Sequence, residues 1–272
     1  MGRRNAGTLR KQSTLNPPLK WAGGKRWLLP WLLPLWERAS TPRLVEPFCG
    51  GLAVALGLNA ERALLNDVNP HLINFYLWLQ RGLVVRLHLA NDKELYYAYR
   101  ARFNELIADP ETAASQEAAE LFYYLNRTGY NGLCRFNKQG AFNVPFGRYK
   151  RINYVQDFSD YQAVLKRWQF TAGDFAEIQA SPVDFIYADP PYDVEFTEYS
   201  QNGFTWDDQV RLAQWLAKHP GPVVASNQAT KRIVELYRGL GFQLTLLDGP
   251  RRISCTGDRT PAKEILAVRN IT

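Results

Sequence analysis

The chain has 272 residues, of which 46% are hydrophobic and 22% charged, and its net charge is +7. This composition excludes disordered and fibrous proteins, and the length allows one large core with a modest inserted subdomain. The positive charge, with a calculated isoelectric point of 9.3, favours a polyanionic partner such as a nucleic acid.

The cysteines, histidines and apolar runs of the sequence argue against metal-binding and membrane-spanning proteins. The three cysteines are scattered, and neither they nor the histidines have zinc-binding spacing, so we expect no metal and a reducing, cytoplasmic setting. No apolar run approaches the ~18 residues of a membrane span, since Pro30 and Pro34 interrupt the stretch at 27–36. Residues 1–18 lack acidic side chains, which fits either a flexible basic arm that contacts phosphates or a tail without function.

Strand-like and helix-like segments alternate along much of the chain. Short apolar runs occur at 44–46, 63–67, 183–188 and 223–226, and helical patterns occur at 52–58, 70–80 and 207–218. This alternation predicts an α/β, Rossmann-like fold with a doubly wound, mainly parallel sheet. Segments 242–247 and 264–268 have no helix between them, so we expect them to pair antiparallel at the sheet edge.

Residues 84–155 do not continue this alternation of strands and helices, and we interpret them as an inserted subdomain. Residues 84–120 are helix-like, whereas 121–151 contain six basic residues and no acid. The predicted organisation is therefore a basic arm at 1–18, a catalytic domain formed by 19–83 and 156–272, and an insertion at 84–155. A solvated basic loop is the alternative for 121–151, but aromatic residues between its charges favour a nucleic-acid surface.

A glycine turn follows the first predicted strand, in the order Glu46-Pro47-Phe48-Cys49-Gly50-Gly51. Adjacent glycines let a ligand approach the backbone, and the acid at the end of the second strand, Asp67, is suited to accept hydrogen bonds from ribose hydroxyls. The turn lacks the spacing typical of pyrophosphate sites, so a nucleoside such as S-adenosylmethionine fits. Taken alone, Gly50-Gly51 is more typical of a plain strand-to-helix turn.

The strongest local signal is the tetrad Asp189-Pro190-Pro191-Tyr192, directly after the strand at 183–188. An exocyclic amine of a base is a poor nucleophile, because its lone pair is delocalised into the ring. Hydrogen bonds from its protons to Asp189 and to the Pro190 carbonyl would free that lone pair, and Tyr192 offers a face on which an extruded base can stack. The alternative is a rigid proline turn with a capping aspartate. Cys49 is not preceded by proline, and we interpret it as a packing residue.

With these segments in order, residues 19–268 resemble the Dam type of DNA adenine methyltransferase, which methylates adenine in GATC. The first mark is the stretch Leu19-Lys20-Trp21-Ala22-Gly23-Gly24-Lys25. The resemblance implies that Trp21 packs against S-adenosylmethionine and that Lys25 approaches its carboxylate. The full set of cofactor-binding residues implied is Trp21, Ala22, Gly23, Lys25, Glu46, Pro47, Phe48, Gly50, Gly51, Asp67, Val68, Asp174, Phe175 and Asp189.

The second mark is the segment 126–149, which in the family is a target-recognition hairpin. The resemblance implies that Arg135 reads a guanine, that Leu133 and Pro145 contact a thymine methyl, and that Lys20 reaches the outer guanine. Tyr130 and Asn131 would help to occupy the gap left by the flipped adenine. The DNA-binding residues implied are Lys20, Arg127, Tyr130, Asn131, Leu133, Arg135, Asn137, Lys138, Pro145 and Arg148.

Weaker matches complete the resemblance. Gly173-Asp174-Phe175 follows a strand and would border the cofactor adenine, and Ser226-Asn227 ends the strand at 223–226 near the site. The segment 251–254 would bind phosphate or form a surface loop.

The predicted activity is methyl transfer to the 6-amino group of adenine in double-stranded DNA, with S-adenosylhomocysteine as product, by a monomer or weak dimer at the nucleoid. Alternatives on the same fold are methylation of RNA adenine, of protein glutamine or of a DNA cytosine amine, and a DNA-binding protein without catalysis.

Overall fold

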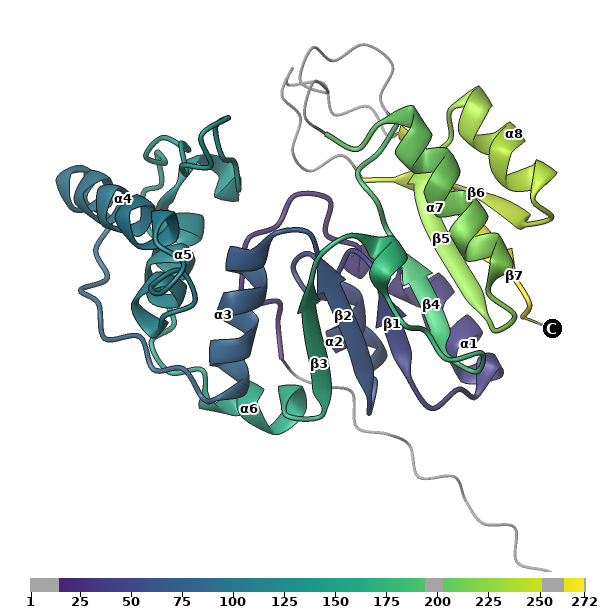
Figure 1. Cartoon of the computed structure of the whole chain (residues 1–272), viewed down its shortest axis with the longest axis horizontal. Helices are drawn as coiled ribbons and strands as arrows, with labels where there is room; N and C mark the ends of the chain where they lie inside the picture. Colours follow the sequence, from purple (N-terminus) through teal and green to yellow (C-terminus); the bar gives the residue numbers. More distant parts are fainter. Residues whose placement is uncertain (1–14, 194–202, 251–261, 272) are drawn as a thin grey trace, which may run out of the picture.

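The computed structural model describes residues 15–193, 203–250 and 262–271, and within them a seven-stranded sheet forms the centre of the molecule (Figure 1). The strand order is β3-β2-β1-β4-β5-β7-β6. The strands are β1 Leu44–Glu46, β2 Ala63–Asp67, β3 Trp168–Ala172, β4 Phe185–Ala188, β5 Val223–Gln228, β6 Gln243–Gly249 and β7 Ala262–Arg269. The first five strands in this order, β3, β2, β1, β4 and β5, are parallel to one another. Strand β7 pairs antiparallel with both β5 and β6.

Helices cover both faces of the sheet with their apolar sides. Because successive strand residues point to opposite faces, Leu44 and Val45 belong to different hydrophobic clusters, one with α1–α5 and the other with α7 and α8. The helices are α1 Leu29–Ala39, α2 Ala53–Leu58, α3 Pro70–Gln80, α4 Lys93–Ala108, α5 Gln116–Thr128, α6 Ser159–Leu165, α7 Trp206–Lys218 and α8 Lys231–Gly239. The doubly wound α/β fold and the antiparallel pair at the edge are confirmed.

Local signals explain where several helices begin. The side chain of Asn69 accepts hydrogen bonds from the backbone N–H groups of His71 and Leu72, and Pro70 opens α3; asparagine and proline both favour these positions. Thr205 and Asp208 form a reciprocal capping box at α7. Helix α1 was not predicted from the interrupted stretch at 27–36. Pro30 lies in its first turn, where proline is tolerated, and Pro34 lies inside it.

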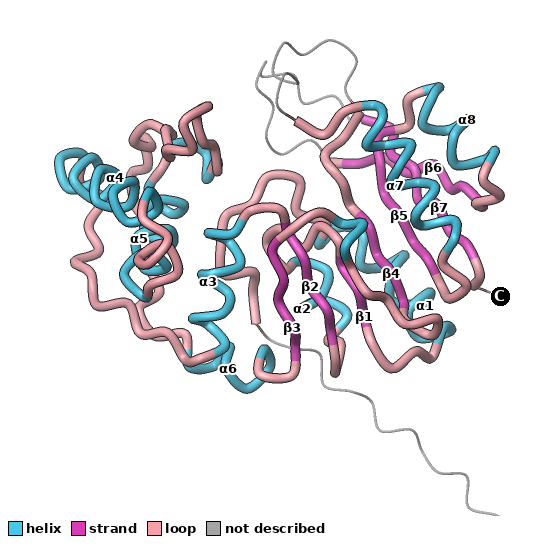
Figure 2. Tube along the Cα trace, in the orientation of Figure 1, coloured by secondary structure: helices cyan, strands magenta, loops and turns pink. Residues whose placement is uncertain are grey.

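The region 84–155 lies to one side of the sheet and holds α4, α5 and a loop-rich segment (Figure 2). Phe75 of α3 stacks on Tyr123 of α5 with ring centroids 5.9 Å apart. Buried residues from this region and from the sheet therefore form one continuous cluster. The division into an insertion and a catalytic domain remains an interpretation of the sequence.

Helix α5 extends to Thr128, so the first residues of the segment 126–149 are helical. A hairpin-like turn follows, with a bridge between Phe136 and Phe142 and a hydrogen bond from the Asn137 N–H to the Ala141 carbonyl, 2.9 Å. Gly140 takes a φ of +78° at this turn. The chain therefore turns back on itself between Phe136 and Phe142, within the segment 126–149. Within the described residues, no helix has the length and apolarity to cross a membrane.

Candidate active site

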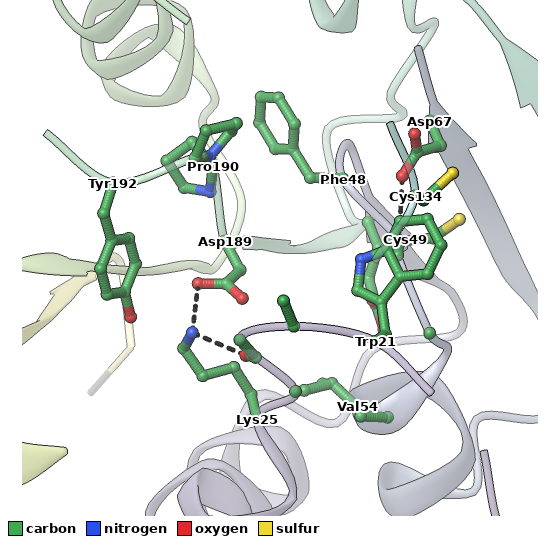
Figure 3. Close-up of a pocket in the computed structure, with 18 of the residues that line it drawn as sticks. Trp21, Lys25, Phe48, Cys49, Val54, Asp67, Cys134, Asp189, Pro190 and Tyr192 are labelled. Carbon is green, nitrogen blue, oxygen red and sulfur yellow. Dashed lines mark hydrogen bonds and ion pairs between the residues drawn. The ribbon is translucent and has the colours of Figure 1, made fainter. Parts of the chain in front are cut away.

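A cavity of about 620 Å³ opens at the carboxyl ends of β1, β2 and β4, where open α/β sheets bind ligands (Figure 3). Five segments that are distant in sequence line it. The lining residues are Trp21–Lys25, Glu46, Phe48–Gly51, Ala53, Val54, Asp67, Val68, Gly132–Cys134, Tyr187 and Asp189–Tyr192. The structure thus brings together the glycine turn, the tetrad and the stretch around Trp21.

The glycine turn after β1 is held tightly beneath the ring of Trp21. Gly50 takes a φ of +43°, and a Cβ added to it would lie 2.7 Å from the Trp21 Nε1; one added to Gly51 would lie 2.8 Å from the Trp21 Cβ. The Gly50 N–H donates to Asp67 Oδ2 at 3.1 Å, and the Tyr76 hydroxyl donates to the Gly50 carbonyl. Both glycines are therefore required by the close approach of the Trp21 ring.

Glu46, at the end of β1, carries a buried carboxyl group at the cavity. The residue is 2% exposed, and among the described residues its Oε1 has no hydrogen-bonding partner. Burial, followed by the nearby charge of Asp189, raises the pKa of this carboxyl well above its usual range. A buried acceptor without a partner is costly, so this oxygen is suited to receive a donor or cationic group from a ligand.

Asp67, at the end of β2, is the acidic group on the other side of the glycine turn. Its Oδ1 accepts from the Asn69 N–H at 3.0 Å, and its Oδ2 accepts from Gly50. Burial raises its pKa despite these two backbone donors. Each carboxylate oxygen has a further lone pair, so Asp67 keeps capacity to accept from a ligand in the cavity.

Asp189, the first residue of the tetrad, has one carboxylate oxygen occupied by the protein. Its Oδ1 lies 3.1 Å from Lys25 Nζ and accepts from the Ser226 hydroxyl at 2.8 Å. The Tyr187 hydroxyl in turn lies 2.9 Å from Ser226 Oγ. Burial raises the pKa of Asp189, and the Lys25 charge and the two side-chain hydrogen bonds oppose this effect. The side chain keeps 20% exposure and lines the cavity.

Lys25 links Asp189 to the rest of the site. Its ammonium also donates to the Gly23 carbonyl at 2.9 Å and lies 4.5 Å from the centroid of the Tyr192 ring. The side chain is 5% exposed, and its bonds to Asp189 and Gly23 are drawn in Figure 3. A buried lysine is thus balanced by a carboxylate, a carbonyl and an aromatic face.

Several contacts fix the backbone around the tetrad. Gln209 Nε2 donates to the Pro191 carbonyl at 2.8 Å, and the Tyr192 hydroxyl donates to Glu264. Arg232 forms a bidentate ion pair with Asp193, the residue after the tetrad. The Pro190 carbonyl has no hydrogen-bonding partner within the described part of the chain, so it is available to a substrate.

The family model described as D12 class N6 adenine-specific DNA methyltransferase matches residues 21–251. The chain belongs to this family. The DNA adenine methylase of Vibrio cholerae is 39% identical over 92% of this chain and 94% of its own length. That of Escherichia coli K12 is 36% identical with the same coverage, and the retron Ec67 DNA adenine methylase of Escherichia coli is 37% identical over 92% and 90%.

The protein is accordingly an adenine-specific DNA methyltransferase, as its resemblance to the Dam type predicted. Membership of this family favours adenine in DNA over the alternatives with RNA adenine, protein glutamine or DNA cytosine as substrate. It also accords with the geometry, because the tetrad lies at the mouth of a cavity bounded by the glycine turn.

The methyltransferase's segment 126–149 contacts residues at and around the cavity. Asn126 accepts from the Lys20 N–H at 2.9 Å, and Asn69 Nδ2 donates to Cys134 Sγ at 3.3 Å. The Lys20 ammonium donates to the Arg127 carbonyl at 3.0 Å and lies 3.5 Å from the Tyr149 ring centroid. Burial, with the nearby Arg127 charge, lowers the pKa of Lys20 to about 8.

The predicted DNA-binding residues of this enzyme differ in exposure. Leu133 lines the cavity, and Arg127 is partly buried and donates to the Asn153 carbonyl at 2.9 Å. Arg135 Nε donates to Asn143 Oδ1 at 2.7 Å, while Asn137 Oδ1 accepts from two backbone N–H groups of its own turn. The exposed members of the set are Tyr130, Asn131, Arg135, Asn137, Lys138, Pro145 and Arg148.

Three predicted cofactor residues do not line the cavity. The Pro47 carbonyl accepts from Asn66 Nδ2 at 3.1 Å, behind the turn. Both oxygens of Asp174 accept from Arg211 of α7 at 2.7 Å, which lowers the pKa of Asp174. Phe175 is 3% exposed and packs against Phe48 at 5.7 Å between ring centroids. The predictions for 251–254 and for the arm up to residue 14 lie outside the described residues.

Sequence reasoning did not single out Tyr187, Gln209 or Glu264, and it placed Ser226 only near the site. No local pattern marks these residues: Tyr187 of β4 contacts Ser226 of β5, whereas Gln209 and Glu264 reach the tetrad from α7 and β7. Their contacts follow from the fold: β5 lies next to β4, β7 pairs with β5, and Gln209 of α7 donates to the Pro191 carbonyl.

Proposed function

We propose that this methyltransferase uses S-adenosylmethionine to methylate the 6-amino group of adenine in GATC within duplex DNA, by flipping the base and by direct in-line transfer. The observation that carries the proposal is Asp189. Its Oδ1 is taken up by Lys25 and Ser226, so Oδ2 and the carbonyl of Pro190, the next residue in the chain, are left as two acceptors for one amino group.

The residues of the cavity fit the cofactor. The unpartnered Glu46 Oε1 suits the cationic amino group of a methionine moiety, and Asp67 suits ribose hydroxyls. A Cβ on Gly50 or Gly51 would collide with Trp21, so these glycines leave the ring free to pack on the ligand. Bound S-adenosylmethionine supplies an electrophilic methyl group on sulfur. We assign its contacts to the predicted residues that line the cavity, and therefore not to Pro47, Asp174 or Phe175.

The tetrad prepares the amino nitrogen for attack. Hydrogen bonds from the two amino protons to Asp189 Oδ2 and to the Pro190 carbonyl draw the lone pair out of conjugation, so that it points toward the methyl group. Gln209 holds the adjacent Pro191 carbonyl and thereby orients the peptide that carries the Pro190 acceptor. After transfer, the proton that faces Asp189 leaves the nitrogen along that hydrogen bond.

Tyr192 provides the face on which the flipped adenine stacks, because its ring borders the same cavity. The DNA partners are the residues of the segment 126–149 together with Lys20. Tyr130 is 46% exposed and Asn131 has a φ of +52°, which presents both at the surface where they can occupy the gap left by the base. Arg135 is proposed to read guanine, and Leu133 and Pro145 to contact the thymine methyl.

The proposal is tested by treating an unmethylated plasmid with the purified enzyme and S-adenosylmethionine, followed by single-molecule sequencing. N6-methyladenine confined to GATC supports the reaction and the site together. Methylation at another motif refutes the assignment of Arg135, Leu133 and Pro145 while leaving the chemistry intact. Cofactor binding without any DNA methylation contradicts the proposal as a whole.

A further inference from the structure

Tyr192 is anchored at its hydroxyl group from the far end of the chain. The hydroxyl donates to Glu264 Oε2, and Lys25 lies against the ring with its ammonium 4.5 Å from the centroid. Glu264 belongs to β7, where it pairs with Gln228 of β5 and Leu247 of β6. A strand at the antiparallel edge of the sheet thus determines where the phenol oxygen of the tetrad lies.

The fold makes room for the Glu264 carboxyl group. Glu264 is 8% exposed, and a Cβ added to Gly249 of β6 would lie 2.6 Å from the Glu264 Cδ. Any larger residue at position 249 would therefore displace this carboxyl. Removal of a charged group from water is costly, so its burial here indicates that its position is specified by the surrounding structure.

Besides Glu264, the Tyr192 side chain has Lys25 against the face of its ring, whereas the contacts on either side of the residue hold its backbone and its neighbour. Gln209 fixes the Pro191 carbonyl, and Arg232 fixes the Asp193 carboxylate. Among the described residues, the Tyr192 hydroxyl has Glu264 as its hydrogen-bonding partner. Loss of this bond would leave the ring free to turn about its side-chain torsions while the backbone stayed in place.

We propose that Glu264 is a positioning residue, which holds the Tyr192 ring at the orientation where the target adenine stacks. The proposal rests on the function proposed above and extends it: the β6–β7 pair helps to orient the substrate base. Because the Glu264 side chain bonds to Tyr192 and, within the described residues, not to the glycine turn or to the segment 126–149, its loss is expected to act on the methyl-transfer step, whereas binding of cofactor and DNA is retained.

The test compares Glu264→Ala, Glu264→Gln and Tyr192→Phe in single-turnover methylation of a GATC duplex. Glu264→Ala and Tyr192→Phe each lower the rate by about 10- to 100-fold, the effect of one hydrogen bond to a charged group, with unchanged dissociation constants for cofactor and DNA. Glu264→Gln recovers most of the rate, because its amide oxygen accepts the same bond. Asp248→Ala is the matched control, since this exposed carboxylate of β6 pairs with Lys263 and lies outside the site.

A spectroscopic readout separates positioning from folding. With 2-aminopurine in place of the target adenine, stacking on Tyr192 quenches the emission of the flipped base, so Glu264→Ala gives a brighter complex than wild type, Glu264→Gln or Asp248→Ala. Wild-type rate and emission in Glu264→Ala overturn the proposal. So does a wild-type rate in Tyr192→Phe, which keeps the ring and does not depend on folding of the alanine variant. Failure of the proposed function is distinguished by the absence of adenine methylation in the wild-type enzyme.

Discussion

Gly50→Ala is expected to destabilise the enzyme and to weaken binding of S-adenosylmethionine. At a φ of +43°, an alanine costs about 1–2 kcal/mol of backbone strain. Its Cβ would also lie 2.7 Å from the Trp21 Nε1, and such overpacking costs a further ~1–3 kcal/mol. The sum is a loss of about 2–5 kcal/mol in the free energy of unfolding. Since Trp21 must move, cofactor affinity is expected to fall at least tenfold, or about 1.4 kcal/mol.

Gly140→Ala is the matched control, because Gly140 also has a positive φ, +78°, but a Cβ there meets no atom within 4 Å. It is expected to lose only the strain of about 1–2 kcal/mol and to bind cofactor normally. Urea unfolding measures the stability of both variants, and isothermal titration calorimetry measures the affinity. Equal destabilisation of the two variants, or normal cofactor affinity in Gly50→Ala, would refute the packing of Trp21 on the turn.

Two further predictions concern charge. Because burial raises the folded-state pKa of Glu46, its contribution to stability is lost as pH rises through that pKa. Glu46→Gln is therefore expected to flatten the fall in stability as the pH rises above the usual pKa of a glutamate, measured by urea unfolding, and to weaken cofactor binding; an unchanged pH slope contradicts this. Arg135→Ala is expected to reduce discrimination between bases at one base pair by about 1–3 kcal/mol. Lys138→Ala is expected to lower the affinity for all DNA sequences and to reduce the slope of log binding constant against log salt concentration by about 1. Competition binding separates these two effects, and equal relaxation by both variants would argue against base reading by Arg135.

The strands at 44–46, 63–67, 183–188 and 223–226 could be predicted because they are short, largely buried runs, whereas β3 and β6 expose most of their residues. Leu44–Glu46 and Ala63–Asp67 are observed with the predicted bounds. The predicted strand at 183–188 begins two residues later, at Phe185, because Val183 is 57% exposed and lies before the buried run. Helix α1 was not predicted because Pro30 and Pro34 interrupt its apolar stretch. Proline is tolerated in the first turn of a helix but disfavoured in its interior, and the sequence alone does not show where the helix begins.

The predictable part of the site is the part carried by contiguous motifs. The glycine turn and the tetrad each follow a strand, so the sheet edge alone brings Gly50 and Asp189 to one cavity. The contacts of Asp189 and Tyr192 with Ser226 and Glu264 depend on the pairing of β5 with β7, which local sequence does not specify. Similarly, the Arg211 partner of Asp174 comes from α7, and nothing near Gly173 predicts it.

The most direct test of the proposed chemistry is single-turnover transfer of labelled methyl from S-adenosylmethionine to a GATC duplex by Asp189→Ala. The Asp189 carboxylate lines the cavity and has the acceptor for the adenine amino group, so we predict cofactor binding with the transfer rate lowered by several orders of magnitude. Near-normal transfer by Asp189→Ala would contradict the assignment of the tetrad as the catalytic site.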